Sequence, residues 1–244
     1  MIPKIIHKTS NTRTWEELHV IKRAKKMMPD FQHIFWTDND NLELVKQVFP
    51  QYVEAYRSIE RGVVRADITR CLYLYLKGGI YCDTDYLFYR PLDDKFLSHR
   101  CVLGIEQENQ KEVGGGYKVG NAFMASQAGL PLWRDFVESI FMRISQSTCR
   151  IKQEGNGTHH QEMSVLYLSG PHALSIFLKE HKEYESQVTF LPAATVYPTL
   201  RWRGLSAIKN EYTIGVHLVW GRWRNIPIME SIKQRIRRWG SAAL

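Results

Sequence analysis

The chain has 244 residues, of which 44% are hydrophobic and 24% charged, and this composition excludes a disordered or collagen-like protein. A chain of this length buries roughly 70% of its unfolded surface and needs no disulfides to fold. No apolar run approaches the ~18 residues of a membrane span, and the first residues do not form a signal peptide. Four scattered cysteines without a CxxC pair favour reduced, buried thiols. We therefore expect a cytoplasmic protein.

The net charge of +8 is concentrated near the C-terminus, because residues 221–244 carry six Lys or Arg against one Glu. Apolar residues follow helical spacing in the same segment: Ile228, Met229, Ile232, Ile236 and Trp239. This pattern predicts a basic amphipathic helix over residues 226–244, after one domain over residues 1–225. The expected partner is an anionic membrane surface, and the alternative is that the apolar stripe packs on the domain itself.

In chain order, the apolar periodicity predicts alternating strands and helices. The first half is predicted to contain strand 2–7, helix 15–28, strand 31–36, a helix over 42–56 that is interrupted near Pro50, helix 64–77 and strand 80–87. The second half is more mixed, with strand 121–126, helix 130–144, helix 171–181 and short strands between them. This order predicts an α/β fold of the nucleotide-binding kind.

Carboxylates gather around the strand predicted over residues 80–87. Asp83 and Asp85 are two positions apart, so both side chains leave the strand on the same side. At the carboxyl end of a strand they point into the crevice where α/β folds bind ligands. Two oxygen donors at this spacing suit Mg²⁺ or Mn²⁺ that also binds diphosphate. On the preceding helix, Asp67 and Arg70 share one face and could grip a polar ligand.

This arrangement resembles the sugar-binding and DXD region of glycosyltransferase family 32, which includes yeast-type α-mannosyltransferases and bacterial capsule and lipopolysaccharide sugar transferases. The similar segments, in the expected order, are Ile2–His7, Phe35–Asp38, Arg65–Arg70, Leu74–Tyr75, Gly78–Asp85, Asn121–Met124, Ser169–Pro171, His217 and Trp220. One departure is Ser10, which stands where the family usually has Trp. The resemblance implies a single-domain GT-A, Rossmann-like fold that binds a nucleotide sugar.

The resemblance also implies a role for each residue of the site. Asp83, Asp85 and His217 would hold Mn²⁺ or Mg²⁺, and Asp67 and Arg70 would act in catalysis by binding the donor sugar. The other expected substrate-binding residues are Tyr81, Asn121, Trp220 and His7.

The implied function is metal-dependent transfer of a hexose, with retention of configuration, from a UDP- or GDP-hexose donor. The acceptor would be a glycan or lipid-linked saccharide in surface polysaccharide synthesis. The protein would act at the inner face of the membrane, and nucleic acid is not an expected partner. The alternative is a non-catalytic basic module that binds membranes or nucleic acid. A third hypothesis, a phosphoesterase, would need further metal ligands at recognisable spacing.

Several residues have a purely structural alternative. Asp67 and Arg70 could form an ordinary ion pair on a helix surface. His217 could be a satisfied core histidine, and Tyr81 and Trp220 could be core aromatics.

Overall fold

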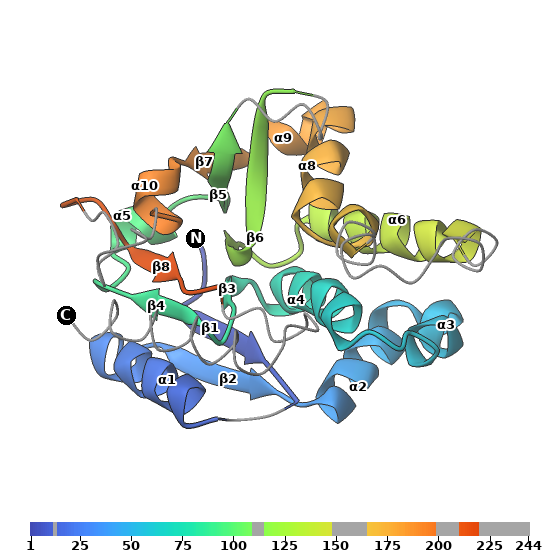
Figure 1. The fold of residues 1–244 in the computed structure, drawn as a ribbon, viewed down its shortest axis with the longest axis horizontal. Coiled ribbons are helices and arrows are strands. Elements are labelled where there is room, and N and C mark those ends of the chain that lie inside the picture. Colours follow the sequence, from blue (N-terminus) through green and yellow to red (C-terminus); the bar gives the residue numbers. More distant parts are fainter. Residues whose placement is uncertain (12–13, 109–114, 148–164, 199–209, 220–244) are drawn as a thin grey trace, which may run out of the picture.

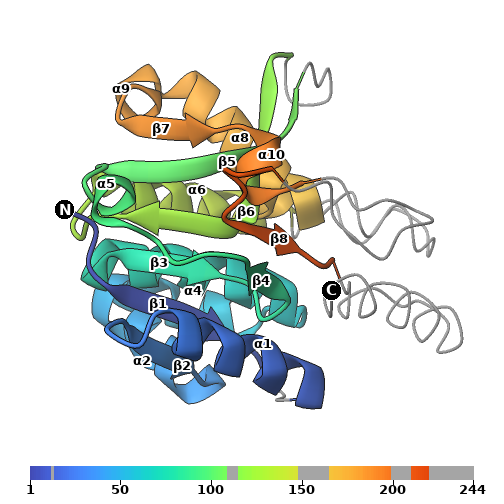
Figure 2. The ribbon, with the colours of Figure 1, turned by 90° about the vertical axis from the view of Figure 1, so that its left-hand side faces the viewer.

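The computed structural model describes residues 1–11, 14–108, 115–147, 165–198 and 210–219. Its larger sheet is mixed and, in the described part of the chain, has six strands (Figures 1 and 2). In spatial order the strands are β2 (Gln32–Trp36), β1 (Ile5–Thr9), β3 (Gly79–Cys82), β6 (Tyr117–Ser126), β5 (Cys101–Glu108) and β7 (Val188–Leu191). Strand β1 runs parallel to β2 and β3, whereas β6 is antiparallel to β3 and β5.

A second sheet pairs β4 (Tyr86–Phe88) antiparallel with β8 (Gly215–His217). The register places Tyr86 opposite His217, so the pairing of β4 with β8 brings Gly215–His217 next to the carboxyl end of β3. The single strand predicted over residues 80–87 is therefore wrong. A turn separates β3 from β4, and the Tyr86 N–H donates to the Asp83 carbonyl at 3.0 Å to close it.

Helices cover both faces of the larger sheet. They are α1 (Trp15–Met27), α2 (Asp38–Val48), α3 (Val53–Arg57), α4 (Gly62–Lys77), α5 (Asp94–Leu97), α6 (Pro131–Ser147), α8 (Pro171–Glu180), α9 (Lys182–Glu185) and α10 (Ala193–Val196), with a 3-10 turn at Pro50–Tyr52. Three hydrophobic clusters lie in the described part of the chain. The first contains the inner faces of α2, α4, α6 and α8, the second lies under α1 and α5, and the small third joins α1 to the β4–β8 sheet. Strand β3 divides its side chains between the clusters, with Tyr81 in the first and Ile80 and Cys82 in the second.

Two further predictions need correction. The helix predicted from residue 42 begins at Asp38, because Thr37 and Asp40 form a capping box there. Strand β5 was not predicted at all, although its buried start at Cys101 carries a short apolar run.

The predicted free and buried thiols are confirmed for Cys71, Cys82 and Cys101. None of the described helices is long and apolar enough to cross a membrane.

Candidate functional site

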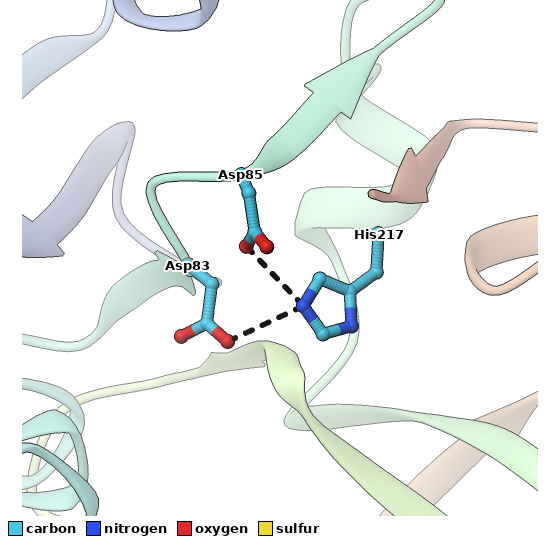
Figure 3. Close-up of side chains that lie close together, drawn as sticks. All are labelled: Asp83, Asp85 and His217. Atoms are coloured by element: carbon cyan, nitrogen blue, oxygen red, sulfur yellow. Dashed lines mark ion pairs between the residues drawn. The ribbon is translucent and has the colours of Figure 1, made fainter. Parts of the chain in front are cut away.

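Three potential metal ligands meet at the carboxyl end of β3. Asp83 directly follows β3, Asp85 directly precedes β4, and His217 is the last residue of β8. The Nε2 atom of His217 lies 3.2 Å from Oδ1 of Asp85 and 3.7 Å from Oδ2 of Asp83 (Figure 3). One ligand atom from each residue lies within 4.8 Å of the other two, and oxygen with imidazole nitrogen is a donor set that Mn²⁺ accepts.

The backbone of the turn that carries the two aspartates is held from several sides. The Asp83 N–H donates to the carbonyl of Ala122 at 2.9 Å, and the Leu218 N–H donates to the carbonyl of Asp85 at 2.9 Å. The buried ammonium of Lys8 donates to the Asp83 carbonyl at 2.7 Å. These contacts fix the turn through its backbone carbonyl and N–H groups rather than through the two carboxylates.

Helix α1 supplies a further support that the sequence analysis missed. The side chain of Glu17 completes the capping box of α1 by accepting from the Thr14 N–H at 2.9 Å. Its other oxygen accepts from the hydroxyl of Thr84, the residue between the two aspartates, at 2.8 Å. The capping pattern was readable from the sequence, but the contact with Thr84 depends on the packing of α1 beside β4.

The two oxygens of Asp83 have different surroundings. Oδ1 accepts from the Tyr81 hydroxyl at 2.6 Å and lies 3.4 Å from the guanidinium of Arg70, whereas Oδ2 faces His217. The Arg70 guanidinium also lies over the Tyr81 ring, 4.6 Å from its centroid. Tyr81 is buried, and its hydroxyl positions Asp83. Its place in the lining of the donor pocket stays a prediction.

Asp67 and Arg70 form a buried pair, which excludes the alternative of a solvated surface ion pair. Their side chains are 3% and 6% exposed, and the charged groups lie 3.2 Å apart. Asn121 connects them, because its side chain donates to Asp67 at 2.9 Å and its carbonyl accepts from Arg70 at 2.8 Å. Ser169, to which no individual role was given, donates to the second oxygen of Asp67 at 2.7 Å.

Burial and neighbouring charges shift the protonation of this site in opposite directions. Burial raises the pKa of Asp67 to about 6, although Arg70 and the Ser169 hydroxyl favour the charged carboxylate. For His217, burial opposes the charged form, but Asp85 and then Asp83 outweigh it and raise its pKa to about 9. The two aspartates therefore keep His217 protonated at neutral pH. A divalent cation would bind between the three side chains in place of that proton.

His7 lies in the core and not in the crevice, so its predicted contact with substrate needs correction. Its side chain is 0% exposed, and both ring nitrogens are used. Nε2 donates to the carbonyl of Gly78 at 2.8 Å, and Nδ1 accepts from the indole N–H of Trp36 at 3.1 Å. Gly79 allows the close approach of β3 to β1, since a Cβ there would lie 2.6 Å from the carbonyl oxygen of Ile5. His7 therefore positions the strands that carry the site.

The remaining predictions lie outside the described residues. These are the role of Trp220, the basic helix at 226–244 and the domain boundary at residue 225.

The fold is that of a GT-A glycosyltransferase domain, and solved structures agree. The PaToxG glycosyltransferase has a TM-score of 0.52 at 16% identity, covering 76% of this chain and 71% of that chain. The UDP-bound glycosyltransferase domain from the YGT toxin has a TM-score of 0.57 at 11% identity, covering 78% of this chain and 79% of that chain. At such identities the likeness shows the fold alone.

Sequence relatives identify the family. Residues 15–103 match the glycosyltransferase sugar-binding region containing the DXD motif. The chain is 37% identical over 177 residues to inositol phosphoceramide mannosyltransferase 3 of Schizosaccharomyces pombe, covering 72% of this chain and 44% of that protein. It is 29% identical over 188 residues to mannosyl phosphorylinositol ceramide synthase CSH1 of Saccharomyces cerevisiae, covering 76% and 45%. The protein belongs to glycosyltransferase family 32, as its sequence predicts, and spans less than half the length of these relatives.

Proposed function

We propose that the protein is a metal-dependent, retaining hexosyltransferase that uses a nucleotide-sugar donor. The observation that carries the proposal is the convergence of Asp83, Asp85 and His217 on one point beside the buried pair of Asp67 and Arg70. The names of the relatives favour mannose as the sugar and a lipid-borne headgroup or glycan as the acceptor. A UDP- or GDP-hexose donor and a role in surface polysaccharide synthesis belong to the same proposal.

The charges of the site suit a divalent cation. Arg70 pairs with Asp67 and Asp83, whereas Asp85 faces His217. The Lys8 ammonium, which contacts the Asp83 carbonyl, is a second nearby cation, so these three carboxylates outnumber the cations by one when His217 is neutral. Asp83 would contribute the oxygen that faces His217, because Tyr81 and Arg70 hold the other one. A bound Mn²⁺ or Mg²⁺ supplies electrostatic stabilisation of the leaving nucleoside diphosphate.

The protein side chains would orient the donor and complete the charge balance. Asp67 is fixed by Asn121 and Ser169 and would accept hydrogen bonds from hydroxyls of the donor sugar. Arg70 adds positive charge beside the leaving diphosphate. The bond from the anomeric carbon to phosphate oxygen breaks, and the acceptor hydroxyl attacks from the same face, which retains the configuration. The acceptor proton passes to the departing phosphate oxygen, so this route needs no protein base.

The deciding experiment is a screen for hydrolysis of UDP- and GDP-linked glucose, galactose and mannose, with and without Mn²⁺. We expect one donor to be hydrolysed only with the metal, and Asp85→Asn to lower that rate by more than about hundredfold, as loss of a metal ligand should. Asp94→Asn is the matched control, since that carboxylate is 86% exposed on α5. Undiminished Mn²⁺-stimulated turnover in Asp85→Asn would contradict the proposal.

A second variant separates binding of the sugar from binding of the metal. Asp67→Asn should abolish turnover yet leave calorimetric binding of Mn²⁺ and nucleoside diphosphate nearly unchanged, because Asp67 contacts Asn121, Ser169 and Arg70 rather than the metal ligands. An equal loss of plain diphosphate binding would instead assign Asp67 to the metal site. The non-catalytic alternative predicts no turnover with any of the six donors.

A further inference from the structure

Helix α1 has two opposite faces of different character. Its inner face carries the buried residues Glu16, Glu17, Val20 and Ala24. The opposite face, which we call the outer face of α1, consists of exposed residues spaced at helical repeats: Trp15, Leu18, His19, Lys22, Lys25 and Lys26.

The outer face has the composition of a helix that lies in a membrane interface. In its first turn the Trp15 side chain is 63% exposed and the Leu18 side chain 40% exposed, among the few large hydrophobic residues exposed in the described part of the chain. Three lysines follow in the next two turns. The two acidic residues of α1 both lie on the buried face, so no carboxylate of the helix offsets these lysines. An apolar start followed by cations suits the headgroup boundary of an anionic bilayer.

The position of this face relative to the catalytic site adds a second argument. Strands β1 and β3 are parallel, so both end at the same edge of the sheet, and α1 begins at that edge after β1 (Figure 2). On the inner side of the first turn, Glu17 accepts from Thr84 between the two metal-binding aspartates. One turn of helix therefore contacts the DXD segment on one side and presents Trp15 and Leu18 to solvent on the other.

We infer that the outer face of α1 docks on an anionic lipid bilayer and holds the donor site next to a lipid-borne acceptor. The inference deepens the proposed function and rests on it for the identity of the acceptor, but not for the docking itself. Each lysine near an anionic surface contributes about fivefold to the membrane partition coefficient, so three contribute about hundredfold. The apolar pair would add to this by entering the headgroup region.

The test is co-sedimentation of the full chain with two kinds of vesicle. One kind is phosphatidylcholine alone, and the other contains about 40% of the anionic lipid phosphatidylglycerol. We expect binding to the anionic vesicles alone. The substitution of Lys22, Lys25 and Lys26 by Gln should lower the partition coefficient by about hundredfold. The matched control replaces three exposed lysines of other helices by Gln and changes the net charge equally: Lys46, Lys95 and Lys182.

The apolar part of the face is tested separately with Trp15→Ser and Leu18→Ser together, which should weaken binding to the same vesicles at least tenfold. Equal loss in the two lysine triples would show a general effect of net charge and overturn the inference. Loss with the α1 lysine triple but not with the apolar pair would indicate a general polyanion site, such as one for nucleic acid, and would also overturn it. Undiminished vesicle binding in every α1 variant would assign docking to another segment.

An assay of donor hydrolysis without vesicles separates failure of the docking inference from failure of the proposed function. The α1 variants should hydrolyse the donor at the wild-type rate, because the substituted side chains are exposed on the outer face of α1, whereas the contact with the DXD segment is made by Glu17 on the buried face. If the wild-type protein binds anionic vesicles through α1 but hydrolyses no donor, the docking stands and the proposed function fails.

Discussion

Acidification should destabilise the protein through one buried histidine, His7. Its two hydrogen bonds require the neutral ring, with the proton on Nε2 for Gly78 and the lone pair on Nδ1 for Trp36. Burial is the main cause that lowers the pKa of His7 to about 4, against an ordinary value of 6.5. Because the folded pKa is below the unfolded one, the unfolded state binds more protons, and stability is lost as the pH falls through this interval.

The expected loss is substantial. One pKa unit corresponds to about 1.36 kcal/mol, so protonation of His7 should cost about 2–3 kcal/mol between pH 8 and pH 4.5. Asp67 acts in the opposite direction, since its folded pKa of about 6 lies above its ordinary value of 3.8. That carboxyl gains protons on folding and adds stability as the pH falls below 6, so the wild-type curve alone would conceal the contribution of His7.

The measurement is therefore a difference between two proteins. Urea unfolding of the wild type and of His7→Gln is compared from pH 8 to pH 4.5, since glutamine can donate and accept but does not titrate. We expect His7→Gln to be less stable at pH 8 and to approach the wild type by about 2–3 kcal/mol as the pH falls. A difference that stays constant with pH would refute the assignment of a buried, neutral His7.

Three further predictions concern the metal site. Tyr81→Phe removes a charge-assisted hydrogen bond to Asp83 and should weaken Mn²⁺ binding, measured by calorimetry, about tenfold to hundredfold with little loss of fold. An unchanged Mn²⁺ affinity would contradict this role of Tyr81. Thr84→Val removes the hydrogen bond between the turn and Glu17 and should weaken Mn²⁺ binding up to about tenfold. If Thr84→Val weakens binding equally in a variant that already lacks the Glu17 carboxylate, the contact between Thr84 and Glu17 does not support the site. Mn²⁺ at about 100 times its Kd should stabilise the protein by about 2.7 kcal/mol in thermal unfolding.

The sequence predicted those parts of the fold that depend on local pattern. The helices with a clear apolar face, such as α4 and α6, were predicted within a few residues of their ends. The turn at Asp83 was not predicted, because apolar residues resume at Tyr86 after only three polar positions, which suggested one strand. What breaks the strand is the pairing of β4 with β8, which lies about 130 residues further along the chain and leaves no local signal.

The site was predicted in its residue types but not in its contacts. Asp83 and Asp85 are two positions apart in the sequence, whereas the approach of His217 depends on the β4–β8 register. Burial excludes the surface ion pair as the explanation of Asp67 and Arg70, and only the packed structure shows that burial. Ser169 lies in a segment that resembles the family, but its contact with Asp67 could not be read from that resemblance. Lys8 reaches the Asp83 carbonyl through a contact for which its sequence neighbourhood gives no indication.

The neutral donors around the carboxylates explain how so much negative charge is held in a partly buried site. Asp67 receives hydrogen bonds from Asn121 and Ser169, and Asp83 receives one from Tyr81, so each carboxylate has a partner that adds no positive charge. A second arginine in place of these donors would stabilise the carboxylates equally well but would cancel the charge that attracts a divalent cation. The arrangement therefore satisfies the hydrogen-bonding needs of the buried oxygens and keeps the site electrostatically prepared for a metal.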